Sequence, residues 1–155
     1  MRSNNLSVWA VKQSDDGLEY ELPMSKHFRK LRSKLLKTLV AFEVGFSLDE
    51  KQSAFTIPAG WEFDGASIPR LFWKVIGEPT DKKFRVAAMV HDWLYGVRYN
   101  RLVADQIFYK LLVQAGVSKS KASLMYTAVR VGGHAVYHKE PSHCVSRATK
   151  LLTGN

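Results

Sequence analysis

Hydrophobic and polar positions alternate over short segments in the first half of the chain, and this pattern predicts strands separated by turns. Residues 6–11 and 18–22 flank the turn-like sequence Ser-Asp-Asp-Gly at 14–17, an arrangement typical of a hairpin. Residues 39–46 and 54–57 lie on either side of a polar turn, so a second pair of strands is expected there.

The segment between these two pairs is less regular. Residues 24–36 are strongly basic, and their apolar positions follow a helical or mixed spacing, at Phe28, Leu31, Leu35 and Leu36. After the second pair of strands, glycines and prolines interrupt the sequence AGWEFDGASIPRLFW, which predicts an irregular loop.

The second half of the chain changes to helical periodicity. Asp81 is placed to cap a first helix that ends at Gly96, and a second helix is expected from about Arg101 to Ala115. Ser118 is a suitable cap for a third helix, which the glycine pair at 132–133 is expected to end.

These elements predict an α+β fold in which an N-terminal β-rich portion packs on a C-terminal helical hairpin and a third helix. The expected organisation is a single domain over residues 1–155, with a β-rich part and irregular loop at 1–75, helices at 80–133 and a tail at 134–155. A length of 155 residues with 46% hydrophobic side chains is sufficient for an ordinary core. The one cysteine, Cys144, excludes an intramolecular disulfide framework.

The chain carries a net charge of +9, and the surplus is uneven. Six Lys or Arg residues fall within twelve positions, at Lys26, Arg29, Lys30, Arg32, Lys34 and Lys37. Such a surface suits anionic lipid or an acidic protein, whereas no zinc-finger or RNA-binding signature accompanies it, so specific nucleic-acid recognition is not expected. Neither a transmembrane segment nor a signal peptide is expected.

Two ionisable residues lie on faces that should be buried. His91 shares a helical stripe with Phe84, Ala87, Ala88 and Leu94, and Asp105 shares one with Leu102, Phe108 and Leu112. A buried carboxylate needs a partner, because an unpaired charge in the core is costly. A connection of about five residues favours an antiparallel hairpin, which places His91 and Asp105 at similar heights. We therefore expect them to pair.

A His–Asp pair of this kind has two interpretations. In the first, Asp105 fixes the tautomer of His91 and raises the basicity of its other ring nitrogen, as in a general base that activates water. Asp92 projects about 100° further round the helix, so it can face a different object, such as a cation or substrate. In the second, the pair is a structural hydrogen bond across two helices.

The loop sequence FDGASIPR is a second candidate for chemistry. Asp64 precedes Gly65, which permits a tight turn or a close approach of the backbone to a ligand. Ser67 and Arg70 follow, and in the functional interpretation the loop lies over the His91 helix as part of an oxygen-rich binding site. In the structural interpretation these residues form a local turn and an ion pair.

Other polar or aromatic residues are weaker candidates. His134, His138 and His143 have no zinc-ligand spacing with the lone cysteine, so no metal site is expected there. Trp61 and Trp93 are expected in the core, although Trp61 also suits the lining of a pocket.

The three blocks FDGASIPR, AAMVHDWLY and RLVADQIF, over roughly residues 55–132, resemble a family of small bacteriophage and prophage proteins with no assigned function. The resemblance implies a phage or prophage origin. It draws attention to Asp64, Ser67, Pro69, Arg70, His91, Asp92, Tyr95 and Asp105, and it implies no reaction.

The motif H-D-x-x-Y in HDWLY also resembles the active-site helix of secreted phospholipases A2, although this chain lacks their disulfides. That resemblance implies His91 as the base, Asp92 as a calcium ligand, and Tyr95 and Asp105 as residues that orient the histidine. Gly65 with its neighbours would correspond to the calcium loop. The pair HD is also similar to that of metal-dependent HD phosphohydrolases, a resemblance that ranks below the phospholipase one.

Two functional hypotheses follow. One is a phage-encoded hydrolase with a His91–Asp105 dyad and a divalent cation, calcium in the first instance, held at Asp92; its substrate would be an ester or a phospholipid. The other is a non-enzymatic phage protein, either a virion component or a binder of a host factor, in which the same residues specify the fold. The expected location is the host cytoplasm or the virion.

Overall fold

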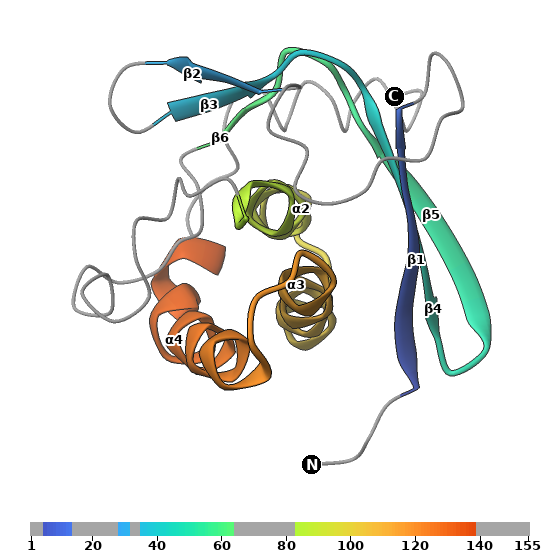
Figure 1. The fold of residues 1–155 in the computed structure, drawn as a ribbon, viewed down its shortest axis with the longest axis vertical. Helices are drawn as coiled ribbons and strands as arrows, with labels where there is room; N and C mark the ends of the chain where they lie inside the picture. Colours follow the sequence, from blue (N-terminus) through green and yellow to red (C-terminus); the bar gives the residue numbers. More distant parts are fainter. Residues whose placement is uncertain (1–4, 14–27, 32–34, 64–82, 139–155) are drawn as a thin grey trace.

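The computed structural model describes residues 5–13, 28–31, 35–63 and 83–138, which form two small sheets beside three helices (Figure 1). The strands are β1 (Leu6–Gln13), β2 (Phe28–Leu31), β3 (Leu35–Thr38), β4 (Phe42–Leu48), β5 (Lys51–Ile57) and β6 (Glu62–Phe63). The helices are α2 (Arg85–Gly96), α3 (Arg101–Gln114) and α4 (Lys119–Tyr137). Strands precede helices along the chain, so the predicted α+β class is confirmed.

The first sheet is antiparallel with the order β1-β4-β5. The predicted strands at 39–46 and 54–57 are confirmed as a hairpin, but its turn is tighter than expected: Leu48 pairs with Lys51, and Asp49 and Glu50 have φ angles of 48° and 68°. Two successive positive φ values give the type I′ turn that matches strand twist. Strand β1 pairs with β4, and its predicted partner at 18–22 lies outside the described residues.

The second sheet is antiparallel with the order β2-β3-β6. Strands β2 and β3 occupy much of the basic stretch, so the helical spacing noted at 28–36 does not correspond to a helix. The cause is long-range pairing, because β3 is held between two neighbours and tertiary context overrides a weak local pattern.

Thr38, at the end of β3, is buried and fixes the turn that precedes β6. Its hydroxyl donates to the carbonyl of Pro58 (2.8 Å) and accepts from the backbone N–H of Trp61 (3.0 Å). The backbone of Thr38 also exchanges hydrogen bonds with Trp61 (3.0 Å) and Gly60 (2.8 Å). Trp61 is thereby held edge-on to Trp93 of α2, with ring centroids 5.4 Å apart, so both tryptophans are core residues as predicted.

The starts and ends of the helices agree with the sequence in part. Helix α2 ends at Gly96 as predicted, but it begins at Arg85 with Phe84 as its first flanking residue, so Asp81 is not its N-cap. Helix α3 matches its expected range and is capped by Asn100, whose side chain accepts from the backbone N–H of Val103.

Helix α4 continues through the glycine pair at 132–133 and ends at Tyr137, so the predicted stop was wrong. The beginning of α4 is as expected, since the hydroxyl of Ser118 accepts from the backbone N–H of Lys121 at 3.4 Å.

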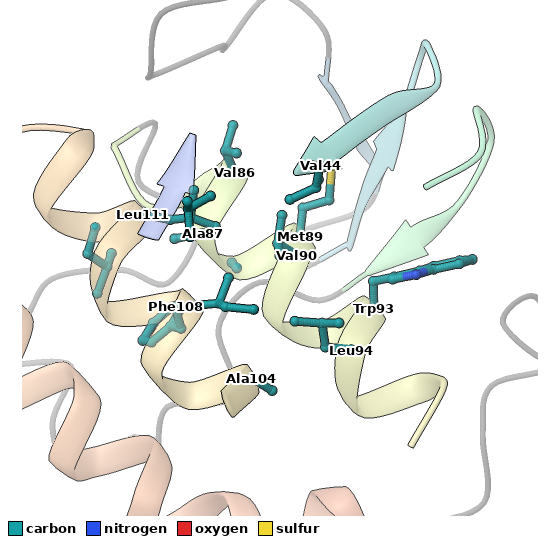
Figure 2. Close-up of a cluster of buried hydrophobic side chains, with 14 of the residues drawn as sticks. Val44, Val86, Ala87, Met89, Val90, Trp93, Leu94, Ala104, Phe108 and Leu111 are labelled. Atoms are coloured by element: carbon teal, nitrogen blue, oxygen red, sulfur yellow. The ribbon is translucent and has the colours of Figure 1, made fainter. Parts of the chain in front are cut away.

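One cluster of buried hydrophobic residues joins the first sheet to the three helices. Figure 2 shows Val44 of β4 beside Met89 and Val90 of α2, with Leu111 of α3 across from them. The side chain of Gln114 at the end of α3 donates to the carbonyl of Val8 (2.6 Å) and ties α3 to β1. Within the described residues, no helix has the length and apolar character needed to cross a bilayer.

Candidate functional site

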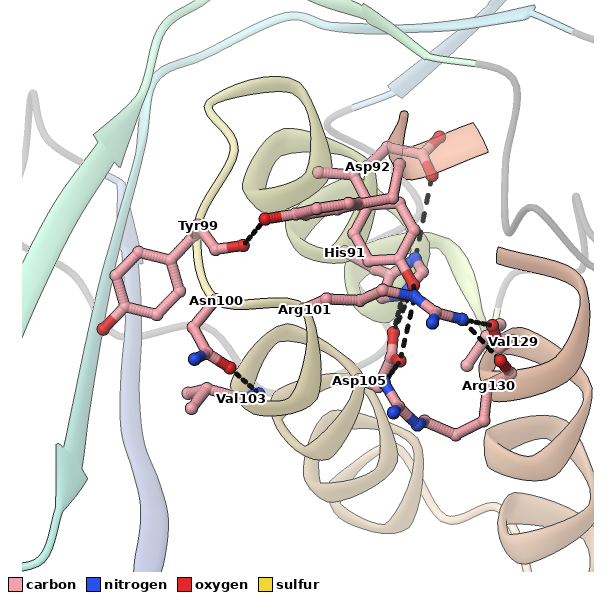
Figure 3. Close-up of polar contacts among 11 residues, drawn as sticks. His91, Asp92, Tyr99, Asn100, Arg101, Val103, Asp105, Val129 and Arg130 are labelled. Carbon is pink, nitrogen blue, oxygen red and sulfur yellow. Dashed lines mark hydrogen bonds and ion pairs between the residues drawn. The ribbon is translucent and has the colours of Figure 1, made fainter. Parts of the chain in front are cut away.

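His91 of α2 and Asp105 of α3 face each other across the helical hairpin (Figure 3). Nε2 of His91 lies 2.7 Å from Oδ1 of Asp105, and both side chains are completely buried. Four residues, 97–100, connect the two helices, so the chain reverses within a short loop and brings the two positions to the same height. The predicted contact between His91 and Asp105 is present.

His91 is not the only hydrogen-bond partner of Asp105 among the described residues. The hydroxyl of Tyr95 donates to Oδ1 at 2.6 Å, and the guanidinium of Arg130 donates to Oδ2 at 2.7 Å. Arg101 lies one helical turn before Asp105, with its Nε 4.0 Å from Oδ2. The carboxylate therefore links all three helices, since Tyr95 comes from α2 and Arg130 from α4.

Arg101 connects this network to the backbone of α4. Its guanidinium donates to the carbonyl of Val129 (3.1 Å) and to that of Arg130, while its Nε donates to the hydroxyl of Tyr95 (3.3 Å). The sequence reasoning did not assign Arg101 or Arg130 to the site. A carboxylate can accept about four hydrogen bonds, so one histidine cannot satisfy a buried one. This difference indicates that Asp105 needs further donors, but it does not say which residues supply them.

The network sets the protonation of its members in opposite directions. Burial alone would lower the pKa of His91, but the hydrogen bond that His91 donates to Asp105 and the charge of Asp92 outweigh it and raise that pKa above its ordinary value. Burial alone would raise the pKa of Asp105, but hydrogen bonds from His91, Tyr95 and Arg130 lower it. Burial and Asp105 together raise the pKa of Tyr95, so its hydroxyl stays a donor.

Stability should therefore be greatest between the folded pKa of Asp105 and that of His91, and it should fall outside that range. The folded pKa of His91 exceeds the unfolded value of about 6.5, so its contribution is complete below that pH and is lost as pH rises through the folded pKa. The folded pKa of Asp105 is below about 3.9, so its contribution is lost as pH falls through that lower value. Urea unfolding across pH measures both limbs, and His91→Gln should flatten the alkaline one. An alkaline limb unchanged in that variant would contradict the assignment.

The second ring nitrogen of His91 is the distinctive feature of the site. Nδ1 is buried and makes no hydrogen bond. Oδ1 of Asp92 lies 3.9 Å from it, too far for a hydrogen bond but close enough for an electrostatic interaction. The side chain of Asp92 is 12% exposed, whereas that of His91 is 0% exposed. Asp92 thus lies beside Nδ1 and is partly exposed.

The rings of Tyr95 and Phe108 hold the imidazole from two directions. Their centroids lie 4.1 Å and 4.9 Å from that of His91. The orientation of His91 is therefore fixed by packing as well as by Asp105. A catalytic role and a structural role would both require this rigidity.

Gly133 of α4 allows Tyr95 to reach Asp105. A Cβ atom at Gly133 would lie 2.6 Å from the hydroxyl oxygen of Tyr95 and 3.2 Å from a ring carbon. This close approach explains the glycine at position 133 inside a helix that the pair was expected to end.

Gly133→Ala should destabilise the protein although alanine is the better helix former. The gain in helix propensity is about 1 kcal/mol, and we expect the overpacked contact, which costs roughly 1–3 kcal/mol, to exceed it. The free energy of unfolding in urea measures the balance. Adding Tyr95→Phe removes the clashing oxygen, so the two changes should be less damaging together than their sum; a Gly133→Ala variant more stable than wild type would refute the contact.

The remaining predicted residues fall elsewhere. Asp64, Gly65, Ser67 and Arg70 lie outside the described residues, so their proposed placement over the His91 helix stays a prediction. In the part of the chain that the structure describes, no three His, Cys, Asp or Glu side chains gather as metal ligands. The assignment of Asp92, beside His91, to a cation stays a prediction.

The fold and the site define an α+β protein whose helices share a buried His–Tyr–Asp–Arg network. Residues 40–129, more than half of the chain, match the family described as protein of unknown function (DUF1353), and the chain belongs to that family. The matched segment contains His91, Tyr95 and Asp105 and ends one residue before Arg130.

Two relatives come from Sinorhizobium fredii (strain NBRC 101917 / NGR234). Uncharacterized protein y4jT is 35% identical over 91 residues, which are 57% of this chain and 27% of that protein. Uncharacterized protein y4iH is 38% identical over 72 residues, 45% of this chain and 30% of that protein. The chain thus spans less than a third of the length of either relative. No solved structure matches.

Proposed function

We propose that this protein is a hydrolase in which His91 activates water through Nδ1 while Asp105 holds Nε2. The observation that carries the proposal is the asymmetry of the two ring nitrogens: Nε2 is bound at 2.7 Å, and Nδ1 is buried without a hydrogen bond. With its Nε2–H directed at Asp105, a neutral imidazole presents a lone pair at Nδ1.

The reaction follows from that tautomer. Nδ1 of His91 accepts a proton from water as the water oxygen attacks the carbonyl carbon of an ester, and the negative Asp105 stabilises the imidazolium that forms. The imidazolium then returns the proton to the leaving alkoxide, so ester and water become acid and alcohol. Because the pKa of His91 is raised, the rate should increase as pH rises through that pKa.

A divalent cation is part of the proposal through Asp92. When bound, such an ion would polarise the ester carbonyl. Calcium takes six to eight oxygen ligands, and Asp92 supplies one described carboxylate, so any others would come from backbone carbonyls, water or residues such as Asp64 outside the described ranges. The proton transfer at His91 requires no step through the cation.

The substrate and setting are also proposed. An ester or phospholipid in an anionic membrane surface is compatible with the basic stretch, which carries six Lys or Arg within twelve residues. A phage or prophage origin, and with it a host-cytoplasmic or virion location, rests on the resemblance of the sequence blocks.

The second candidate function is a non-enzymatic phage protein, a virion component or a binder of a host factor. The observation that favours it is burial: His91 and Asp105 expose no surface, and Asp105 of α3 accepts hydrogen bonds from residues of α2 and α4. In this case the network specifies how the helices pack.

Hydrolysis assays on anionic phospholipid vesicles and on a soluble ester, with and without calcium, distinguish the hydrolase from the non-enzymatic protein. The decisive variant is His91→Gln, because its amide can still donate to Asp105 but cannot act as a base. In the hydrolase, activity should fall by at least about 100-fold while the fold is retained. Thr127→Ala, an exposed change on α4, is the control and should keep full activity. Equal hydrolysis rates in wild type and His91→Gln would contradict the hydrolase and favour the structural role of the network.

A further inference from the structure

A pair of histidines lies at the C-terminal end of α4, with His134 in the last turn and His138 directly after Tyr137. Because the helix continues through the glycine pair to Tyr137, His134 and His138 are separated by one helical turn and not by an irregular tail. The backbone N–H of His138 donates to the carbonyl of His134 at 3.2 Å, which confirms that the turn is closed. Both side chains are exposed.

The two imidazoles are close enough to bind one ion together. Their ring centroids lie 4.4 Å apart with the ring planes inclined at 53°. Two imidazole nitrogens at about 2.1 Å from one metal in tetrahedral geometry are about 3.4 Å apart, a separation that rings at this distance reach by small side-chain rotations. Histidines at positions i and i+4 of a helix are a recurrent metal-binding arrangement for this reason.

We propose that His134 and His138 form a surface site that chelates a transition-metal ion of the kind imidazole prefers, Cu²⁺, Ni²⁺ or Zn²⁺. The site supplies two ligands, and water or another donor fills the other positions. It is independent of the proposed hydrolase activity and of any calcium at Asp92, since its ligands are nitrogens and lie at the end of another helix.

The surroundings hold the pair in place and determine which ions suit it. The ring of Tyr137 packs edge-on against His138 at 5.3 Å, and its hydroxyl donates to the carbonyl of Tyr99 at 3.0 Å, so the end of α4 is fixed to the loop after α2. Arg98 donates to the carbonyl of Tyr137 and brings a positive charge to the same helix end. That charge weakens the binding of every cation. The two ligands are imidazole nitrogens, which suit transition metals and not hard oxygen-seeking ions such as Ca²⁺, so Ca²⁺ should not bind here.

Calorimetric titration of the full chain with each metal separately tests the site. The Cys144→Ser background removes the thiol as a competing ligand. We expect affinity in the order Cu²⁺ above Ni²⁺ and Zn²⁺, with no response to Ca²⁺ at this site. His134→Ala and His138→Ala should each reduce Ni²⁺ affinity by at least about tenfold. Loss of a residue that only hydrogen-bonds a metal ligand already costs about tenfold, and loss of a ligand should cost no less.

The matched control is His143→Ala, which removes a nearby histidine of the sequence but leaves the pair, and Ni²⁺ affinity should not change. A second readout is NMR: Ni²⁺ should broaden the imidazole signals of His134 and His138 before those of other histidines. The proposal is overturned if the parent protein binds neither Cu²⁺ nor Ni²⁺, if both alanine variants bind as the parent does, or if His143→Ala loses as much affinity as they do.

Discussion

Replacing Asp105 by asparagine is expected to lower the free energy of unfolding by about 3 kcal/mol. Removing one partner of a buried ion pair typically costs 3–5 kcal/mol, because the other charge is left without compensation. Asparagine keeps the size of the side chain and one acceptor oxygen, so the lower end of that range applies. Its amide cannot accept from Tyr95, His91 and Arg130 together, whereas the carboxylate does so at 2.6, 2.7 and 2.7 Å.

Urea or guanidinium unfolding of Asp105→Asn measures this loss. Asp49→Asn is the matched control, since it makes the same chemical change at an exposed turn, where a change within about 0.5 kcal/mol is expected. An NMR titration gives a second readout: without Asp105 the pKa of His91 should fall, because burial then outweighs the charge of Asp92. Equal stability of the two variants would show that the network contributes little.

The contact between His91 and Asp105 was predictable because it depended on local patterns. Each residue interrupts an apolar stripe of its own helix, and the short connection between the helices limits where the two stripes meet. Burial then requires a partner for the carboxylate.

The contacts that α4 makes with Asp105 and Tyr95 were not predictable in the same way. Arg130 reaches Asp105 across 25 positions of sequence, and a partly exposed arginine on a helix looks like any surface residue. Gly133 was misread because glycine is both a common helix stop and the residue that permits close approach. Its contact with Tyr95 depends on how two helices pack, which no local pattern specifies.

The basic stretch shows a related limit. Residues 28–31 and 35–38 have no strict alternation, and they become strands because they pair with each other and with Glu62–Phe63. By contrast, the strands at Phe42–Leu48 and Lys51–Ile57 form a local hairpin, so the sequence was sufficient to predict them.

Phe108 joins the hydrophobic core to the polar network. It is completely buried on α3, three residues after Asp105, and its ring lies 4.9 Å from that of His91 at an angle of 45°. One side of His91 therefore faces Asp105 and another faces an apolar ring. This ring helps to exclude water, and exclusion of water opposes the charged form of the histidine.

Phe108→Ala should accordingly have two effects. The free energy of unfolding should fall by about 3–5 kcal/mol, because a fully buried ring is replaced by a cavity. In the folded protein, water should enter the space beside His91. The pKa of that histidine should then rise further, because burial lowers this pKa in the wild-type protein.

Leu102→Ala on the same helix is the control: Leu102 is 41% exposed, so its loss should cost less than about 1 kcal/mol and leave the pKa of His91 unchanged. If the two variants lose similar stability, Phe108 is not the link between core and network. If Phe108→Ala unfolds less readily than expected but shifts the pKa of His91 downward, the cavity has collapsed onto the imidazole and increased its burial.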